Sequence, residues 1–315
     1  MHLGKEMKSI SSPIISAHPF ITSVILNSNR RDDTLACLRS LAESTYERLS
    51  VMVLDNASTD GSVEAIRAEF PEVQIVPLSE NKGYAGNNNV GISLALEQGA
   101  DWVLVLNEDT LLAPNCIEHL VAAGESDPRV GIVGPMVYHA DEPNVIQSAG
   151  GIFDVYWRPK HVEQNEPDVG QFANTRSVGW ISGCALMIRR ETVENIGLLD
   201  ERFFYYWEET EWCFRAQKHG WQILHVPQAK LWHKGVQRDY RPSPAVTYYN
   251  TRNRLLFLSK HRASLLPWLV AWFEILRPLA SWSLRPKWRS MREHRRASWR
   301  GVMDFFHRRW GAVRL

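Results

Sequence analysis

The sequence predicts an α/β fold with a mostly parallel central sheet flanked by helices, followed by a basic helical extension. Between residues 20 and 106, short apolar runs alternate with segments of helical periodicity, as in sheets whose parallel strands are joined by crossover helices. Three of the apolar runs lead directly into polar, turn-forming residues, and ligands bind at that edge of such sheets. Lys, Arg and Trp residues are concentrated near the C-terminus.

Charge is distributed unevenly along the 315 residues, a length that suits one large domain or two modest ones. From Thr251 to the end, 15 Lys and Arg residues stand against three acidic residues, so this part carries +12 and the first 250 residues carry −11. Six of the 13 Trp residues also lie there. An acidic body with a basic, Trp-rich tail suggests two separate tasks.

The four cysteines are widely spaced and form no metal or redox pair, so we expect buried thiols in a reducing compartment. Residues 1–18 are expected to form a flexible arm, and they contain no apolar stretch of signal-peptide length, so no export is expected. No uncharged apolar run reaches the length of about 18 residues that predicts a membrane span.

The first half of the chain contains the alternating elements. A strand over Phe20–Asn27 precedes a helix over Arg31–Ser44, which Asp32 or Asp33 can cap. A second strand, Leu49–Leu54, leads through a polar loop into a short helix. The remaining elements are a strand over Val73–Leu78, a loop entering a helix over Tyr84–Gln98 that ends at Gly99, with the Gly- and Asn-rich segment expected to be loop, and a strand over Trp102–Leu106.

Polar segments follow three of these strands: Asp55 follows the second, Asn81–Asn89 the third and Asn107–Asp109 the fourth. The Gly- and Asn-rich segment can present backbone N–H groups and Lys82 to an anion at a helix start. It lacks the Gly-Lys-Ser/Thr of a Walker loop. It also lacks the Gly-x-Gly-x-x-Gly pattern after a first strand, which argues against a dinucleotide-binding Rossmann domain.

Glu108 and Asp109 follow the end of the fourth strand, which is predicted to be buried. Two carboxylates at such a position are well placed to hold a hard cation, because these ions prefer oxygen ligands. The alternative is an acidic loop that caps a helix beginning near Pro114.

The second half is less regular. Tyr138–Thr175 contains few apolar runs and is expected to form long loops, which in a compact domain are usually functional. Strands are expected over Val178–Arg189 and around Ile223–Val226, with a helix over Glu208–His219 between them. The acidic residues in the first turn of that helix are either ordinary complements to the helix dipole or functional groups.

The tail contains apolar residues at three- and four-residue spacing, with Glu274 on the opposite face and Pro267 and Pro278 expected to bound the helix. A basic run over Arg285–Arg300 follows. These features suit the interface of an anionic membrane leaflet, or else a core-packing helix followed by a solvated charged end. Nucleic acid is not an expected partner, because the acidic body would repel a phosphate backbone. The apolar residues are Leu265, Trp268, Leu269, Trp272, Phe273, Leu276 and Leu279.

The order of these motifs resembles that of the family 2 glycosyltransferases, and most of all their bacterial rhamnosyltransferase-like branch. The resemblance covers about residues 20 to 260 and is carried by the whole series of motifs. The series consists of Asp55-Asn56-x-Ser58-x-Asp60-Gly61-Ser62, Asn81-x-Gly83-Tyr84-Ala85-Gly86-x-Asn88, Leu106-Asn107-x-Asp109-Thr110, Gly179–Gly183, Phe203–Arg215, Trp232-His233-Lys234-Gly235 and Tyr248–Arg254.

The resemblance implies a GT-A fold, with a nucleotide-binding half over about residues 19–112 and an acceptor-binding half over about 113–250. Residues 251–315 would be the membrane-associating extension. The implied activity is an inverting, metal-dependent transfer of a sugar from a dTDP- or UDP-sugar, and rhamnose is the sugar that the resemblance favours. The acceptor would be a hydroxyl of a cell-surface glycan or polyprenyl-linked precursor. Mg²⁺ or Mn²⁺ would be the cofactor, and the enzyme would lie in the cytoplasm on the inner face of the cell membrane.

The resemblance also implies roles for donor-side residues. Asp55 would contact the base, and Asp109 would bind the metal at the last position of the family's Asp-x-Asp-like motif, with Asn107 at its first position. The segment Asn27-Ser28-Asn29 departs from the family's usual Thr-Tyr-Asn, which removes an aromatic side chain from the donor site. Further donor contacts are expected from Asn29, Asn81, Lys82, Gly83 and Asn88.

On the acceptor side, Glu209 stands at the position of the family's aspartate base, and Glu208 precedes it as the supporting acid. Spacing alone leaves Glu211 as a competitor, because Glu208 and Glu211 share a helix face and Glu209 points about 100° away from Glu208. His233 resembles the family's late His, and is either a further metal ligand or a structural residue.

Two other functions would need different residues. A non-catalytic nucleotide-sugar-binding or scaffold protein would be favoured by loss of Asp109 or of the Glu209 carboxylate, and both are present. A sugar-nucleotide nucleotidyltransferase would need an N-terminal Gly-rich triphosphate loop, and Asn27–Arg31 contains none.

Overall fold

The computed structural model describes residues 18–235, 240–284 and 286–313, so most of the expected N-terminal arm lies outside the described residues. The described helices are α1 (Arg31–Ala42), α2 (Ser62–Glu69), α3 (Gly83–Glu97), α4 (Cys116–Gly124), α5 (Arg190–Ile196), α6 (Glu208–Lys218), α7 (Pro244–Lys260), α8 (Leu265–Leu284), the 3₁₀ segment η1 (Pro286–Met291) and α9 (Arg292–Phe306). The strands are β1 (Ile21–Asn27), β2 (Leu49–Asp55), β3 (Gln74–Pro77), β4 (Trp102–Asn107), β5 (Thr110–Leu112), β6 (Val130–His139), β7 (Ile146–Ser148), β8 (Gly151–Phe153), β9 (Pro159–His161), β10 (Arg176–Ser177), β11 (Ala185–Arg189) and β12 (Gln222–His233).

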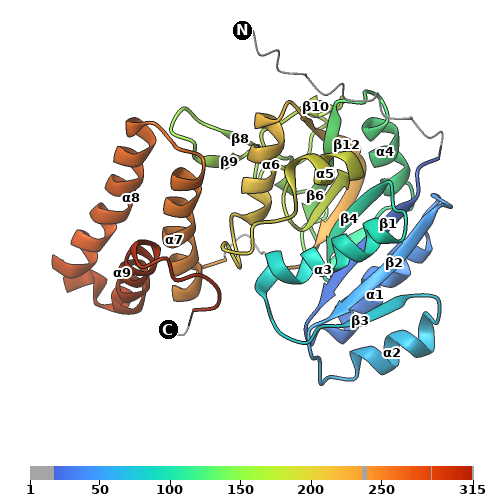
Figure 1. Ribbon diagram of the computed structural model, residues 1–315, viewed down its shortest axis with the longest axis horizontal. Helices are drawn as coiled ribbons and strands as arrows, with labels where there is room; N and C mark the ends of the chain where they lie inside the picture. The colour runs from blue at the N-terminus through green and yellow to red at the C-terminus, as the bar shows by residue number, and fades with distance from the viewer. Residues whose placement is uncertain (1–17, 236–239, 285, 314–315) are drawn as a thin grey trace, which may run out of the picture.

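One large mixed sheet forms the centre of the molecule, in the order β10-β12-β6-β11-β4-β1-β2-β3 (Figure 1). The four N-terminal strands are parallel, as the alternation of strands and helices predicts, and β11 is antiparallel to both of its neighbours. In this register Asn27 of β1 pairs with Asp55 of β2, and Leu26 pairs with Asn107 of β4. The polar residues that follow these strands therefore meet at one edge.

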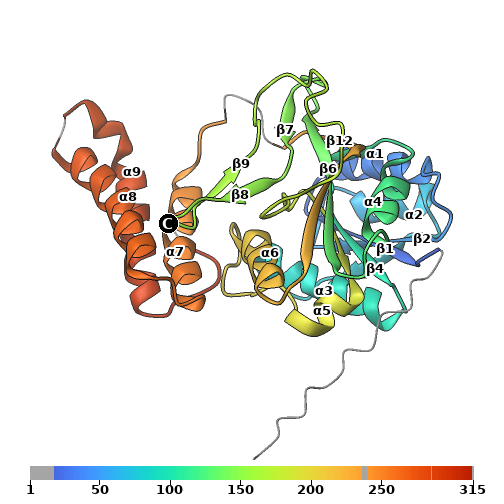
Figure 2. The same ribbon diagram turned by 90° about the horizontal axis from the view of Figure 1, so that it is seen from above.

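Both faces of the sheet are buried. Helices α1, α2 and α4 contribute Leu38, Ile66 and Leu120 to the core on one face, and α3, α5 and α6 contribute to the core on the other, as Figures 1 and 2 show. Because both faces are covered, nearly every residue of β1 and β4 is buried, and β4 is apolar from Trp102 to Leu106.

Two predicted details of the N-terminal half are wrong. Neither Asp32 nor Asp33 caps α1, because the helix already begins at Arg31, after an N-cap at Arg30 that makes no side-chain capping bond. Both carboxylates lie in the first turn, and Asp33 pairs with Arg30 and Lys234 at 2.8 Å each. The Gly- and Asn-rich segment is mostly helix, since α3 already begins at Gly83.

The region after β6 was expected to form long loops, but it also contains short strands. Residues 138–175 include the end of β6, β7 and the β8–β9 hairpin, and long loops join these short strands. The predicted strand Val178–Arg189 is regular only over β11, because the segment before it turns toward the β8–β9 hairpin, where Gly151 forms an isolated bridge with Trp180.

Helices α7, α8 and α9 lie together at the end of the molecule opposite α2 (Figures 1 and 2). The boundary expected between residues 250 and 251 falls inside α7, which starts earlier because Ser243 caps it and Pro244 occupies its first turn. The expectation that Pro278 bounds the tail helix is wrong, because α8 continues to Leu284. Ile275 and Leu279, on either side of Pro278, pack with Leu255 and Val302 and hold the helix together there.

Candidate active site

Asp55 is buried at the carboxyl end of β2 and is held by its neighbours. Its Oδ1 accepts a hydrogen bond of 3.0 Å from the Asn27 side chain, and its Oδ2 accepts one of 3.2 Å from the Ser58 backbone N–H. Asn27 also donates to Ser58 Oγ at 3.0 Å and accepts from Thr34 at 2.9 Å. The carboxylate is therefore fixed in position at the sheet edge, as a contact to a nucleotide base requires.

Asn29 lies beside this group with a positive φ of 54°. Its backbone N–H donates to Ser58 Oγ at 3.0 Å, and its Oδ1 accepts from the Thr59 backbone N–H at 2.8 Å. The side chain thus braces the loop after β2. This contact is with the protein itself, and the donor role of Asn29 stays a prediction.

The start of α3 is fixed by Asn81 and a close backbone approach. Asn81 Oδ1 accepts from the Gly83 N–H at 2.9 Å. Gly83 has a φ of 74°, and a Cβ there would lie 2.3 Å from the Phe204 carbonyl oxygen, so only glycine fits. Lys82 is exposed and pairs with Glu80 at 3.3 Å. Asn88 is fully buried, with its Nδ2 donating to the Tyr84 carbonyl at 3.0 Å and its Oδ1 without a partner among the described residues.

Asp109 lies between Arg30 and His233. Its Oδ2 is 3.3 Å from Arg30 Nη2, and its Oδ1 is 3.1 Å from His233 Nε2. Burial alone raises the pKa of Asp109, but the His233 ring and the Arg30 guanidinium outweigh it, so that the pKa is lowered and the carboxylate is charged at neutral pH. The neighbouring Glu108 has its pKa raised to about 7, chiefly by burial.

A chain of hydrogen bonds fixes the orientation of the His233 ring. His233 Nδ1 donates to Gln147 Oε1 at 2.6 Å, because an amide oxygen can only accept. Gln147 Nε2 lies 3.4 Å from His139 Nδ1, and His139 Nε2 lies 2.9 Å from Asn165 Oδ1. This network directs Nε2 of His233 toward Asp109, and His233 Nε2 and Asp109 Oδ1 lie 3.1 Å apart. Because each of these two atoms carries a lone pair, a proton or a cation must lie between them.

The Asp109–His233 pair fits a divalent cation. Oδ1 of Asp109 is buried and has no hydrogen bond of good geometry among the described residues. A Cβ on Gly235 would lie 2.7 Å from Asp109 Oδ2 and 3.0 Å from His233 Nε2, so this backbone leaves room only for glycine. No group of three or more His, Cys, Asp or Glu side chains is arranged for a metal in the described parts of the chain. Further ligands would have to come from a bound diphosphate and water.

The alternative role of this acidic segment as a helix cap is excluded by the structure. β5 lies between Asp109 and α4, and the N-cap of α4 is Asn115, without a side-chain capping bond. β5 pairs with the end of β12, with Thr110 opposite His233. That pairing brings the two candidate ligands together, although they are far apart in the sequence.

The three glutamates at the start of α6 have different surroundings. Glu208 is buried, its Oε2 has no partner among the described residues, and burial together with the Glu209 charge raises its pKa well above the ordinary value. Glu209 is partly exposed to a cavity and lies beside Gly183, and burial raises its pKa. A Glu208 that keeps its proton leaves the negative charge on Glu209.

Glu211 is committed to ion pairs within the protein. It is fully buried and contacts Lys260 at 2.9 Å, Arg215 at 3.0 Å and His261 at 3.0 Å. Although burial raises the pKa of Glu211, these partners outweigh it and lower the pKa to about 2. Such a carboxylate is a poor proton acceptor, so the competition among the three glutamates is reduced to Glu208 and Glu209.

We expect Glu211→Gln to lower the free energy of unfolding at pH 7 by about 3 kcal/mol, because it removes the carboxylate that pairs with Arg215 and one of the two that pair with Lys260, at a site that is largely buried. The depressed pKa means that this contribution is present above about pH 4.5 and is lost as the pH falls toward 2. Urea unfolding of both proteins at pH 7 and pH 3 measures it, and the difference should shrink at pH 3. Glu194→Gln, at an exposed pair with Arg190, is the control and should change stability by less than about 0.5 kcal/mol. An equal loss at both pH values would contradict the assignment.

The loop before Glu208 is held by α7. Phe204, Tyr206 and Trp207 have positive φ angles of 63°, 66° and 78°. Asn253 Nδ2 lies within 2.9 Å of the carbonyl oxygens of residues 203, 205 and 206, and Arg252 Nη2 donates to the Phe203 carbonyl at 3.0 Å. These contacts fix the left-handed turn that aims Glu208 and Glu209. The Tyr248–Arg254 motif contains both residues, but no sequence pattern indicates that they hold this turn.

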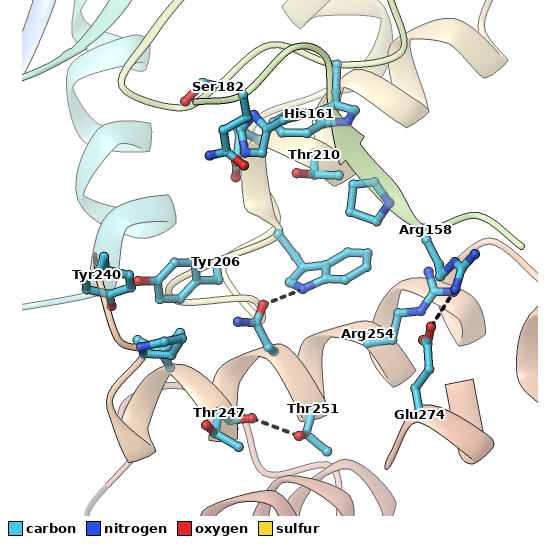
Figure 3. Close-up of a pocket in the computed structure, with 18 of the residues that line it drawn as sticks. Arg158, His161, Ser182, Tyr206, Thr210, Tyr240, Thr247, Thr251, Arg254 and Glu274 are labelled. Carbon is cyan, nitrogen blue, oxygen red and sulfur yellow. Dashed lines mark hydrogen bonds and ion pairs between the residues drawn. The ribbon is translucent and has the colours of Figure 1, made fainter. Parts of the chain in front are cut away.

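A cavity of about 760 Å³ is lined by residues that include His233, Glu209 and, from α8, Ala271 and Ile275. Tyr206 and Tyr240 lie at one side of this cavity and Arg158, Arg254 and Glu274 at the other (Figure 3). Arg158 pairs with Glu274 at 2.9 Å. A cavity that connects the candidate metal pair with the candidate base is the natural place for an acceptor.

The chain is similar to a known family of glycosyltransferases and to several of its members. The profile of Glycosyl transferase family 2 matches residues 22–197. An N-acetylglucosaminyl-diphospho-decaprenol L-rhamnosyltransferase of Mycobacterium tuberculosis is 30% identical over 254 residues, covering 71% of this chain and 79% of that protein. A dTDP-rhamnosyl transferase of Shigella flexneri is 26% identical over 254 residues, covering 78% of this chain and 82% of its own length.

Solved structures show the same fold. A mannosyltransferase of Pyrobaculum calidifontis in complex with GDP-Man and Mn²⁺ matches with a TM-score of 0.57 and 17% identity, covering 93% of this chain and 89% of that chain. GalNAc-T7 with UDP, GalNAc and Mn²⁺ matches with a TM-score of 0.62 and 16% identity, covering 92% of this chain and 56% of that chain. The predicted GT-A fold is confirmed by these likenesses.

Proposed function

Because the chain belongs to glycosyl transferase family 2 and is a rhamnosyltransferase-like nucleotide-sugar glycosyltransferase, we propose that it transfers rhamnose from dTDP-rhamnose to a polyprenyl-linked glycan precursor. The two rhamnosyltransferase relatives support the donor, and the decaprenol-linked substrate named for one of them supports the acceptor. Residues 19–112 would bind the nucleotide and residues 113–250 the acceptor.

We propose that the donor lies at the carboxyl edge of β1, β2 and β4. Asp55 would contact the base, with Asn29, Asn81, Lys82, Gly83, Asn88 and Asn107 completing the donor site. Asp109 and His233 would hold Mg²⁺ or Mn²⁺. The bound cation would supply positive charge that offsets the negative charge on the departing diphosphate. Arg30 pairs with Oδ2 of Asp109, the oxygen that does not face His233, and would add a second positive charge near the diphosphate.

On the acceptor side we propose a single displacement with inversion at the sugar. Glu209 would take the proton of the acceptor hydroxyl as the oxygen attacks the anomeric carbon and the diphosphate leaves. Glu208 would stay protonated beside it. The observation that carries this assignment is the cavity that reaches both His233 and Glu209, because it gives an acceptor access to a base within reach of the donor end.

We expect dTDP-rhamnose with Mg²⁺ or Mn²⁺ to raise the thermal unfolding temperature more than UDP-glucose or GDP-mannose does. A ligand at a hundredfold excess over its Kd adds about 2.7 kcal/mol to the free energy of unfolding. The panel is measured by thermal shift with each metal and with EDTA, and the configuration of the transferred sugar is then determined by NMR.

Free dTDP is the matched control, since it shows how much of the effect the sugar supplies. Stabilisation that is the same in EDTA would contradict a metal-dependent donor site. A product that keeps the donor's anomeric configuration would contradict the single displacement.

A further inference from the structure

Helix α8 is apolar on two opposite faces. Its inner face packs in the molecule through buried Pro267, Ala271, Ile275 and Leu279. Its outer face carries four large apolar side chains at three- and four-residue spacing, each at least half exposed, and we call this row the outer stripe. The outer stripe consists of Leu266 (52% exposed), Leu269 (55%), Phe273 (64%) and Leu276 (50%).

Helix α9 extends this surface. Trp299, Met303 and Phe306 follow one another at four- and three-residue spacing and are 55%, 47% and 61% exposed. The Phe306 ring stacks on Trp272 of α8 with centroids 6.0 Å apart, which ties the two helices together. A groove of about 600 Å³ runs between them, with Leu276 and Leu279 on one side and Trp299 on the other.

The groove also contains basic groups without counter-charges. Arg295 and Arg296 line it, and neither forms an ion pair with any residue that the structure describes. Arg277 extends over the face of Phe273, at 5.9 Å from the ring centroid. Of the acidic residues on these helices, Asp304 lies near Arg300 and Arg309 and Glu274 pairs with Arg158, which leaves Glu293 beside the cluster.

We propose that the outer stripe, the exposed face of α9 and the groove between them form a docking surface for an anionic lipid bilayer. Apolar side chains beside unpaired guanidinium groups match the depth profile of a leaflet, where acyl chains lie below a layer of phosphates. The surface would lie on the bilayer without crossing it, since no described helix is both long and apolar enough to span a membrane.

A second copy of this chain is the other candidate occupant, and charge argues against it. In a symmetric dimer both copies use the same patch, so that the Arg295 and Arg296 side chains of both copies would lie in one interface, where their like charges repel. Anionic lipid supplies the missing counter-charge instead. The chain after residue 250 contains 15 basic and three acidic residues, and this positive charge strengthens the complementarity with anionic lipid.

Docking would also hold the cavity that contains Glu209 close to the bilayer. Ala271, Ile275 and Pro278 on the inner face of α8 line the cavity that reaches Glu209, so one helix would contact the bilayer on one side and the acceptor on the other. This consequence rests on the proposed function, whereas the docking surface itself does not. Vesicle binding without any substrate therefore tests the surface separately.

The test is co-sedimentation of the full chain with phosphatidylcholine vesicles and with mixed phosphatidylcholine–phosphatidylglycerol vesicles. We expect binding to the mixed vesicles alone, weakening with salt because exposed charges are screened within about 10 Å at 0.1 M. The double variant Arg295→Ala/Arg296→Ala should reduce the partition coefficient by about 30-fold. Phe273→Glu and Leu269→Glu should each reduce it by at least about tenfold.

Matched controls lie elsewhere on the surface. Arg67→Ala removes an exposed arginine of α2, and Val169→Glu changes a side chain that is 82% exposed, so both should bind as the unchanged protein does. All variants are first checked for an unchanged thermal unfolding temperature and unchanged dTDP-sugar binding. Equal binding to neutral and anionic vesicles, or full binding by the arginine double variant, would overturn the proposal. So would a concentration-dependent dimer that Phe273→Glu dissociates, since the surface would then belong to a second copy.

Discussion

Replacing Glu209 by Gln is expected to lower the rate of sugar transfer by at least about a hundredfold while the affinity for the donor stays the same. An acceptor hydroxyl is a poor nucleophile at neutral pH, and general-base assistance contributes about 10²- to 10⁴-fold. Glutamine keeps the shape and hydrogen bonding of Glu209 but cannot take a proton. Steady-state kinetics with the donor varied, together with calorimetric binding of the nucleotide sugar, separates loss of chemistry from loss of binding.

The pH profile is a second readout of the same group. Burial raises the pKa of Glu209 above the ordinary glutamate value of 4.5. Because the base works only when it is deprotonated, the rate should fall with decreasing pH, and this fall should begin above pH 4.5. That acid limb should disappear in Glu209→Gln. If Glu209→Gln keeps near-normal turnover and Glu208→Gln does not, the wrong carboxylate has been assigned. Glu211→Gln serves as the neighbouring control, because its expected effect is on stability.

Replacing Asp109 by Asn is expected to remove metal-dependent turnover with the fold intact. A metal that stabilises charge on a departing diphosphate contributes several kcal/mol to the transition state, which corresponds to at least about a hundredfold in rate. The substitution removes the charge that faces His233 and Arg30, while the backbone bond from Lys234 N–H to the Asp109 carbonyl, at 3.0 Å, remains. Titration calorimetry of Mn²⁺ in the presence of dTDP measures the site directly.

Glu108→Gln is the matched control for this variant. Glu108 is the adjacent carboxylate, and no ion pair with Arg30 or His233 is found for it among the described residues. It should retain the metal response and bind Mn²⁺ as the unchanged protein does. Unchanged metal and donor affinity in Asp109→Asn would show that the metal site lies elsewhere.

Sequence by itself determined the fold class, because the evidence for it is local. Buried parallel strands need continuous apolar runs, such as Trp102–Leu106, and the helices between them need an apolar stripe. The polar residues after those runs then had to meet at one edge, and the register of Asn27 with Asp55 confirms this. The ends of helices are not determined locally where packing overrides local preference. Helix α8, for example, continues through Pro278, which lies between the buried residues Ile275 and Leu279.

Only the tertiary structure decided which of these residues act on one another. Helical spacing could not separate Glu209 from Glu211, and the difference comes from Lys260 and His261, which lie at the C-terminal end of α7, about 50 residues away along the chain. In the same way, Asp109 and His233 meet because β5 pairs with β12, and Gln147 then orients the His233 ring. The pKa values and lone-pair directions on which chemistry depends are set by partners distant in sequence, since burial and Coulomb interactions depend on distance in space.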